Sequence, residues 1–335
     1  MGTPHSLPAY TAREIQMQGE AGMARDKAPK IVVAGGDGRL TEAALALAEG
    51  GAEVCLWRAL GEESAPKDPT DRALSLLRPR PLPDKESLRE AGVSLCSALP
   101  EGAGGDLLLL PLPASRDGVR LHGAGAPTVA EAEAALGRFG TVVGGGLSAS
   151  LLASARRAGA RVYDLLEDPA FVYANARLTA EATLGYLLLA SPFSPAETTL
   201  LVVGFGRIGA ILVRLARSVG YQVRVVARRE LSRLQAEELG ARAFSPDRLG
   251  EAAEGVRWIC NTVPYPLFSP AVWAGLDPSC TVVELAGGQN LPDPALTPAA
   301  TVCLPALPGR VYPRSAGRLV ALAALDRLSH IEEHT

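Results

Sequence analysis

The segment TLLVVGFGRIG at 199–209 constrains the fold of this chain more than any other part of the sequence. An apolar run that fits a buried strand leads into three glycines, and an Ala/Leu/Val-rich helix pattern follows. With this spacing, the first glycine allows a tight turn, the second lets the backbone approach a pyrophosphate, and the third permits close helix–strand packing. The segment therefore predicts a Rossmann domain, with a tight turn that binds nothing as the alternative. The expected dinucleotide-binding residues are Gly204, Phe205, Gly206, Arg207, Ile208 and Gly209.

The end of the next expected strand, QVRVVA at 222–227, distinguishes between the two nicotinamide dinucleotides. A domain that binds NAD usually carries Asp or Glu at this point, where the carboxylate holds the ribose 2′-hydroxyl. Here the strand runs into Arg228 and Arg229 instead. A guanidinium suits the 2′-phosphate of NADP because its planar fork makes bidentate, charge-assisted hydrogen bonds. We therefore predict NADP as the cofactor and NAD as the weaker alternative; two solvated arginines are the other interpretation.

Strand-like and helix-like segments alternate along most of the chain, which is typical of a parallel sheet covered by helices on both faces. The sequence predicts an α/β fold of two Rossmann-like, doubly wound parallel-sheet domains with an interdomain cleft. We expect a disordered N-terminal extension, a substrate domain, a linking helix, the dinucleotide domain, and a C-terminal helix that packs back on the first domain. These parts are expected at 1–29, 30–177, 178–195, 196–312 and 313–330.

The charge balance and the cysteines argue against several classes of protein. The formal net charge is −3, which gives no electrostatic basis for binding nucleic acid or an anionic membrane surface. No long apolar run indicates a membrane span or a signal peptide. None of the five cysteines forms a C-x-x-C pair, so we expect no metal site. We expect a cytoplasmic protein with reduced cysteines.

Two further segments directly follow expected strands, at the edge where open α/β sheets bind their ligands. The turn GGDGR at 35–39 resembles a glycine turn without the full dinucleotide spacing, and it carries Asp37 and Arg39. The segment NTVP at 261–264 follows a strand of the dinucleotide domain and is expected to border the nicotinamide ribose, with a simple turn as the alternative. Its expected binding residues are Asn261, Thr262 and Pro264.

The order of these and other motifs resembles that of the family formed by the A subunit of dipicolinate synthase. The similarity extends from about Lys30 to Leu328. The C-terminal motif is the most specific, because a Leu-Pro-Gly run before a Pro-basic-Ser/Thr-Ala-Gly helix start is far less common than a Rossmann fingerprint. The motifs are IVVAGGDGR at 31–39, LLPLP at 109–113, LTAEATLGYLL at 178–188, VVGFGRIG at 202–209, ICNTVP at 259–264 and LPALPGRVYPRSAG at 304–317.

This resemblance implies an NADP-dependent dehydrogenase subunit. Its reaction would oxidise dihydrodipicolinate to dipicolinate, the pyridine dicarboxylate of spores, with hydride transfer to the nicotinamide. The resemblance also implies a small flavoprotein-like partner, the B subunit of dipicolinate synthase, and a location in the mother-cell cytoplasm of a sporulating bacterium. The sequence leaves open whether the chain forms homo-oligomers.

A small dicarboxylate substrate requires cationic clamps, and planar guanidiniums fit carboxylates well. The candidates are Arg39, Arg310 and Arg314, with Tyr312 and Ser315 beside them at the expected start of the C-terminal helix. The family has Lys at the position of Arg314 and Thr at that of Ser315. Arg314 keeps the positive charge, and we count it among the expected catalytic residues. A guanidinium cannot, however, act as a base near neutral pH.

Aromatisation of the substrate also releases a proton, so a base is needed. Glu181, on the expected linking helix, is the first candidate, and Asp37 is the second. Thr179 and Thr183 are four residues apart and share a helix face, so Glu181 points elsewhere and at most one of these two groups faces a ligand. A carboxylate on the helix surface is the alternative interpretation of Glu181.

Two other functions fit a dinucleotide domain. One is another NAD(P)-dependent amino-acid or hydroxyacid dehydrogenase, although the Arg/Glu/His arrangement of 2-hydroxyacid dehydrogenases is not evident. The other is a non-catalytic dinucleotide-binding subunit of a flavoprotein complex.

Overall fold

The computed structural model describes residues 27–58, 82–287, 292 and 294–329, which divide into two compact units. The first unit contains the described residues up to Asn175 together with those from Tyr312 onward, and the second contains Ala176–Val311. Nearly all of the extension expected at 1–29 lies outside the described residues.

The first unit is built on a six-stranded sheet in the order β3-β2-β1-β4-β5-β6. Neighbouring strands run parallel, and β1 lies between β2 and β4 in register. Runs rich in Val, Ile and Leu form the central strands because both of their faces are buried. The strands are β1 (Lys30–Ala34), β2 (Glu53–Trp57), β3 (Ser94–Cys96), β4 (Gly105–Leu109), β5 (Phe139–Gly144) and β6 (Arg161–Asp164).

The second unit repeats this topology with six parallel strands in the order β12-β11-β10-β7-β8-β9. Both sheets therefore have the 3-2-1-4-5-6 arrangement of a Rossmann domain, in which the strand order reverses beside the first strand. The predicted fold class of two Rossmann-like α/β domains is confirmed, while the interdomain cleft stays a prediction. The strands are β7 (Thr199–Val203), β8 (Gln222–Val226), β9 (Arg242–Phe244), β10 (Trp258–Asn261), β11 (Thr281–Glu284) and β12 (Ala300–Cys303).

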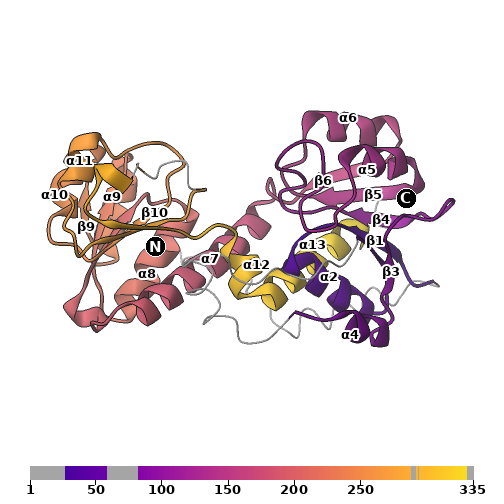
Figure 1. Cartoon of the computed structure of the whole chain (residues 1–335), viewed down its shortest axis with the longest axis horizontal. Helices are drawn as coiled ribbons and strands as arrows, with labels where there is room; N and C mark the ends of the chain where they lie inside the picture. The colour runs from indigo at the N-terminus through magenta and orange to yellow at the C-terminus, as the bar shows by residue number, and fades with distance from the viewer. Residues whose placement is uncertain (1–26, 59–81, 288–291, 293, 330–335) are drawn as a thin grey trace, which may run out of the picture. The chain divides into compact units, whose positions relative to one another are not determined.

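Helices cover both faces of the first sheet, as Figure 1 shows with α5 and α6 on one side and α2 and α13 on the other. Alternate strand residues such as Val32, Leu108 and Val142 join the core under α5 and α6. The helices of this unit are α2 (Gly38–Glu49), α4 (Lys85–Glu90), α5 (Val129–Ala135), α6 (Ala149–Arg157) and α13 (Pro313–Ser329), with a 3₁₀ turn at Leu136–Arg138.

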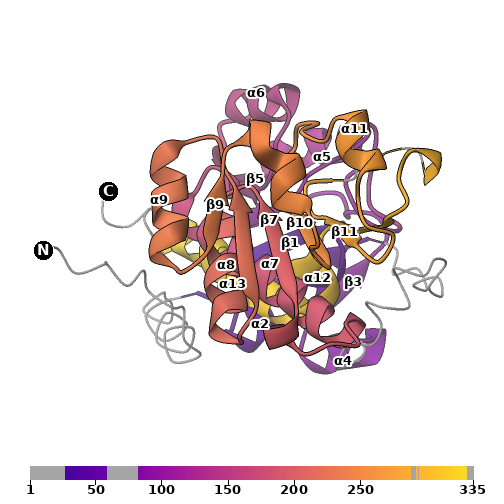
Figure 2. The same ribbon diagram turned by 90° about the vertical axis from the view of Figure 1, so that its left-hand side faces the viewer.

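The second sheet has α10 and α11 on the face formed by Leu201, Val203 and Ile259. Figure 2 turns this unit toward the viewer and shows α9 beside β9 at one edge of the sheet. The helices are α8 (Arg207–Ser218), α9 (Glu230–Glu238), α10 (Leu249–Ala253), α11 (Pro270–Ala274) and α12 (Leu307–Val311). Three 3₁₀ turns lie at Pro195–Glu197, Pro246–Arg248 and Pro294–Leu296.

The long helix α7 (Pro169–Ala190) begins nine residues before the linking helix that we expected from residue 178. Its start is explained by Asp168, whose carboxylate accepts hydrogen bonds from the backbone N–H groups of Ala170 (2.8 Å) and Phe171 (3.2 Å). Proline at the first helical position adds to this start signal. Within the described residues, no helix combines the length and apolar character that a membrane span requires.

Helices α2 and α13 approach each other closely at Gly317. A Cβ atom at this position would lie 2.6 Å from the Glu42 Cβ, 2.7 Å from the Ala43 nitrogen and 2.7 Å from the Arg39 oxygen. Since two of these three atoms belong to the backbone of α2, they cannot move aside cheaply. Only glycine therefore lets α13 lie this close to the helix that follows β1.

We predict that Gly317→Ala lowers the free energy of unfolding by ~1–3 kcal/mol, the usual cost of overpacking. Denaturant unfolding would measure the change. Gly250→Ala in α10 is the matched control, because a Cβ there would meet Val272 Cγ2 at an ordinary 3.9 Å. That control should be neutral or slightly stabilising, since alanine favours helix over glycine by about 1 kcal/mol. Equal effects in the two variants would contradict the close-packing argument.

Candidate active site

The glycine loop of the second unit joins β7 to α8 at the carboxyl edge of the sheet. Gly204 has a φ of 101°, and its N–H donates to the Val226 carbonyl at 2.8 Å. A Cβ at Gly204 would lie 2.4 Å from Thr262 Oγ1, and one at Gly209 would lie 2.1 Å from the Gly204 oxygen. The first glycine therefore permits the turn, and the third lets α8 pack directly on that turn, as the fingerprint requires.

Gly206 differs from the other two glycines because its surroundings are open. It is exposed, its φ is −83°, and a Cβ there would meet nothing within 4 Å. It precedes the first residue of α8, and no side chain caps this helix end. The backbone N–H groups of the first turn therefore face outward between half-buried Phe205 and Ile208 and exposed Arg207. Such a helix end attracts phosphate through its N–H groups and its dipole.

Arg228 and Arg229 follow β8 and are exposed. Because β7 and β8 are parallel, with Val203 in register with Val226, the two arginines lie on the same sheet edge as the glycine loop. Arg233 of α9 fixes the backbone of this segment by donating to the carbonyls of Ala227 (3.0 Å) and Arg228 (2.9 Å). Two exposed arginines therefore follow the strand that is paired with β7, which leads into the glycine loop.

The segment predicted at 261–264 lies beside the glycine loop, since β10 pairs with β7 at the point where the strand order reverses. Thr262 Oγ1 donates to the Val203 carbonyl at 2.9 Å, and Pro264 is exposed. Asn261 is buried and donates through Nδ2 to Glu284 Oε2 at 2.7 Å. Sequence reasoning missed Glu284 as a site residue, although an acid that ends the apolar strand TVVE was a usable signal.

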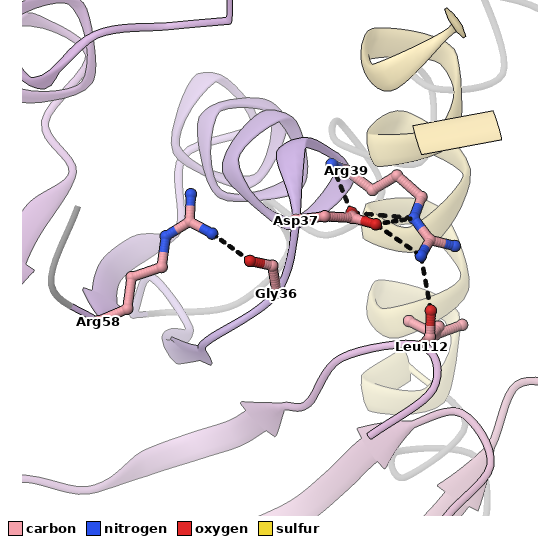
Figure 3. Close-up of polar contacts among 5 residues, drawn as sticks. All are labelled: Gly36, Asp37, Arg39, Arg58 and Leu112. Atoms are coloured by element: carbon pink, nitrogen blue, oxygen red, sulfur yellow. Dashed lines mark hydrogen bonds and ion pairs between the residues drawn. The ribbon is translucent and has the colours of Figure 1, made fainter. Parts of the chain in front are cut away.

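In the first unit, Asp37 and Arg39 form a closed ion pair at the end of β1 (Figure 3). Arg39 Nε lies 3.0 and 3.1 Å from the two carboxylate oxygens, and Nη2 donates to Asp37 Oδ2 (2.8 Å) and to the Leu112 carbonyl (2.6 Å). Asp37 also accepts from the Arg39 N–H and so caps α2. Most of the hydrogen-bonding capacity of both side chains is therefore used within the unit.

The pKa of Asp37 reflects this pairing. Burial alone would raise the pKa of the carboxyl, but the hydrogen bonds and charge of Arg39 outweigh burial and bring it below its ordinary value. Burial, together with the charge of Arg116, lowers the pKa of neighbouring His122. A carboxylate with a lowered pKa is a weak proton acceptor, which ranks Asp37 behind other bases.

The glycine turn after β1 is covered by its own unit. The Gly36 N–H donates to the His122 carbonyl at 2.6 Å, and a Cβ at Gly123 would lie 2.1 Å from the Gly36 oxygen. Arg58 donates to the same Gly36 oxygen (Figure 3). A pyrophosphate cannot approach the N–H of Gly36 while the segment around His122 lies against it. The glycine loop at 204–209 is therefore the better dinucleotide site.

The candidate base Glu181 lies on α7 and pairs with Arg177 one turn earlier, with Arg177 Nε 2.7 Å from Glu181 Oε1. Thr179 and Thr183 lie on the buried side of the helix, and the Thr183 hydroxyl donates to the Thr179 carbonyl at 2.8 Å. The two threonines thus face away from Glu181, as their spacing indicated. This ion pair would have to open for Glu181 to accept a proton from a substrate.

The predicted substrate-binding residues near the C-terminus lie around the start of α13. Arg314 and Ser315 are exposed in its first turn, Tyr312 precedes it and is half-buried, and half-buried Arg310 belongs to α12. Arg314 Nε lies 4.0 Å from Glu42 Oε2 on α2. Burial raises the pKa of Glu42 in spite of the Arg314 charge, so this contact is a weak ion pair. It leaves the Arg314 guanidinium accessible.

Comparison with known proteins supports this site. Residues 189–299 match the family described as D-isomer specific 2-hydroxyacid dehydrogenase, NAD binding domain. The matched range includes the glycine loop, Arg228, Arg229 and the 261–264 segment. The chain therefore contains a dehydrogenase-type domain for a nicotinamide dinucleotide, although the match does not separate NADP from NAD.

The A subunit of dipicolinate synthase from Bacillus subtilis (strain 168) is 25% identical over 195 residues, 57% of this chain and 66% of that protein, just under two thirds of its length. The crystal structure of dipicolinate synthase, A chain, from Bacillus subtilis has a TM-score of 0.71 at 21% identity, covering 93% of this chain and 100% of that one. For the corresponding subunit from Bacillus halodurans the TM-score is 0.70 at 20% identity, with coverages of 90% and 98%.

We predict that Gly206→Ala folds with near wild-type stability but binds nicotinamide dinucleotide about tenfold more weakly or worse, a loss of about 1.4 kcal/mol. The added methyl meets no protein atom within 4 Å, yet it stands where the backbone must approach the pyrophosphate. Titration calorimetry and thermal unfolding would measure the two effects. Gly209→Ala should instead destabilise the fold itself. Undiminished affinity of Gly206→Ala would refute the proposed phosphate position.

The family resemblance that was inferred from the sequence motifs is thus confirmed: the chain resembles the A subunit of dipicolinate synthase in sequence and shares its Rossmann-like α/β fold.

Proposed function

We propose that this chain is the dehydrogenase subunit of a dipicolinate synthase and oxidises dihydrodipicolinate to dipicolinate with NADP as hydride acceptor. The observation that carries the proposal is the sequence match to the A subunit of dipicolinate synthase over 195 residues. The proposal includes the flavoprotein-like B subunit as partner and the mother-cell cytoplasm as location. Activity, substrate and partner are all part of the proposal.

The choice of NADP is supported by Arg228 and Arg229. They are exposed at the end of β8, where an acid would hold the 2′-hydroxyl of NAD. A 2′-phosphate would receive charge-assisted hydrogen bonds from one or both guanidiniums. When bound, the oxidised nicotinamide supplies the hydride-accepting carbon.

The substrate and the released proton are assigned to other side chains of the chain. The two carboxylates of dihydrodipicolinate would pair with Arg314 and Arg310, with Tyr312 and Ser315 as further hydrogen-bond donors. Arg39 is a weaker clamp because its guanidinium already binds Asp37 and the Leu112 carbonyl. Glu181 is the preferred proton acceptor, because the lowered pKa of Asp37 weakens that residue as a base.

A hydroxyacid or amino-acid dehydrogenase is the second candidate, and the family match of residues 189–299 favours it. That match covers the dinucleotide domain and excludes the segments that would bind the substrate, so it supports the class of cofactor more than the class of substrate. The third candidate is a dinucleotide-binding subunit whose chemistry resides in the flavoprotein partner.

The test of the function is NADPH formation by the purified chain, alone and with the B subunit of a dipicolinate synthase. We expect NADPH absorbance to rise with dihydrodipicolinate and to stay flat with 2-hydroxy acids and amino acids. Turnover with a hydroxy acid alone would replace the proposal with the second candidate. Dinucleotide binding without turnover until the flavoprotein partner is added would favour the third.

Two variants in the same assay separate a substrate clamp from an ion pair between helices. Arg314→Ala should lower kcat/KM for dihydrodipicolinate roughly tenfold or more, the cost of one charge-assisted hydrogen bond. Glu42→Gln removes the negative partner of Arg314 but keeps the guanidinium, so it should leave kcat/KM near the wild-type value. If both variants lose activity equally, Arg314 acts through α2 and the clamp role fails.

Cofactor preference gives a further prediction. Arg228→Ala should weaken NADPH binding about tenfold or more while NADH binding stays nearly unchanged, because the lost partner is specific to the 2′-phosphate. Fluorescence titration of both reduced cofactors would measure the ratio. Arg214→Ala, an exposed arginine on α8, is the charge-matched control. A parallel loss of both affinities, or of neither, would remove the basis for predicting NADP.

A further inference from the structure

A buried polar pair ends β10, which pairs with β7, and β11, which pairs with the other side of β10. Glu284 closes β11, Asn261 closes β10, and the two residues are in register. Each side chain belongs to a residue that is only 1% exposed. The Glu284 carboxylate accepts from Asn261 Nδ2 at 2.7 Å and from the Ala286 N–H at 2.6 Å. One oxygen thus holds the end of β10, and the other holds the chain that leaves β11.

Asn261 passes this contact on to the segment that follows it. Its Nδ2 also donates to the Val263 carbonyl at 3.2 Å, and its Oδ1 accepts from the Val263 N–H at 3.1 Å. The side chain therefore closes a small ring with the backbone two residues ahead. Its orientation is fixed at both the amide nitrogen and the amide oxygen.

The segment held by Asn261 forms the wall of the glycine loop. The N–H and the hydroxyl of Thr262 both donate to the Val203 carbonyl at 2.9 Å. A Cβ at Gly204 would lie 2.4 Å from Thr262 Oγ1 and 2.8 Å from Val263 Cγ2. If residues 262–263 shifted, they would therefore press on the turn that is predicted to bind the dinucleotide.

We propose that Glu284 is a positioning residue for the nicotinamide dinucleotide: its ionised carboxylate holds Asn261, and through Asn261 the 262–263 segment, against the glycine loop. The proposal rests on dinucleotide binding at residues 204–209, and it is independent of which substrate is oxidised.

A carboxylate is the group this position needs. The two partners of Glu284 are both N–H donors, and an ionised carboxyl is the side-chain group that offers acceptors on both oxygens. Glutamine would turn an NH₂ group toward one of these donors, and an apolar residue would leave both donors buried and unpaired. The cost of keeping a charge here is burial away from water without a neighbouring cation in register.

That cost makes the contact sensitive to pH. Burial raises the pKa of Glu284 above its ordinary value, although the hydrogen bonds from Asn261 and Ala286 lower it in part. On the neighbouring strand β12, the titratable residue in register is Cys303. As the pH falls through the raised pKa of Glu284, the carboxyl gains a proton and one oxygen ceases to accept. Dinucleotide affinity should therefore weaken toward acidic pH.

The test compares the affinity of the full chain for NADH in the wild type, Glu284→Gln and Glu254→Gln, an exposed control in the same unit. NADH is the probe because the 2′-phosphate of NADPH titrates near pH 6 and would add its own pH dependence. We expect Glu284→Gln to bind NADH about tenfold more weakly at neutral pH, the effect of one buried unpaired donor. The control should match the wild type.

The pH profile separates this role from a general loss of stability. As the pH is lowered from neutral, wild-type affinity should fall, and the profile of Glu284→Gln should be flat because glutamine does not titrate. Asn261→Ala should also flatten the profile, and Glu284→Gln should cost little more in that background, since coupled residues are not additive.

Wild-type NADH affinity in Glu284→Gln, or a pH step that persists in this variant, would overturn the proposal. So would additive losses in the double variant. If Glu284→Gln does not fold, the profile of Asn261→Ala decides: a flat profile supports the proposal and a wild-type step refutes it. A wild-type chain that binds neither NADH nor NADPH would instead refute the proposed function as a whole.

Discussion

Both candidate sites depend on one constraint. The strand that precedes each glycine turn pairs in parallel with a strand far along the chain. β1 pairs with β4, and β7 pairs with β10, in each case where the strand order reverses. Because parallel strands end at one edge, the turn after the first strand meets the segment after its distant partner. Thr262 thus reaches Gly204, and the Leu112 carbonyl, three residues beyond β4, reaches Arg39.

The same topology produces two different edges because the segments that follow the partner strands differ. In the second unit, residues 262–263 pack beside the glycine loop and leave exposed Gly206 open. In the first unit, the chain continues to His122 and Gly123, which lie on the Gly36 peptide. One edge keeps its N–H groups available for phosphate, and the other uses them internally. Dinucleotide binding is therefore supported at the glycine loop of the second unit and not at the glycine turn of the first.

The two units also differ in the surroundings of a carboxylate near the end of a strand. The carboxylate of Asp37 is partly buried beside the Arg39 guanidinium, which outweighs the effect of burial and lowers the pKa of Asp37. The carboxylate of Glu284 is buried against two N–H donors, and burial raises its pKa. Both groups hold backbone near the end of a strand, but the pKa of the first is lowered and the pKa of the second is raised. One neighbouring side chain explains the contrast, because Asp37 lies beside the Arg39 guanidinium and Glu284 lies against two N–H donors.

The features predicted correctly from sequence are local ones. The strand–turn–helix at 199–209 and the strand expected at 222–227 each depend on residues within a few positions of one another. The edge strands β3 and β9 were not predicted, because three residues are too few to show an alternating pattern. The start of α7 was missed although Asp168-Pro169 is a recognisable cap. Glu284 ends an apolar strand, but its contact with Asn261 was missed because that partner lies 23 residues earlier and strand register brings the two together.

The substrate side of the proposed site depends on charged residues that already have partners. Arg39, Glu181 and Arg314 were chosen by residue type, and each has an acidic or basic partner within its own unit. An existing partner lowers the gain from binding a ligand, because the old ion pair must be given up. The loss is greatest for Arg39, which is 8% exposed and makes bonds to two groups, and least for Arg314, whose contact at 4.0 Å is loose and exposed. Substrate carboxylates should therefore be recognised first by the arginine that is held most weakly.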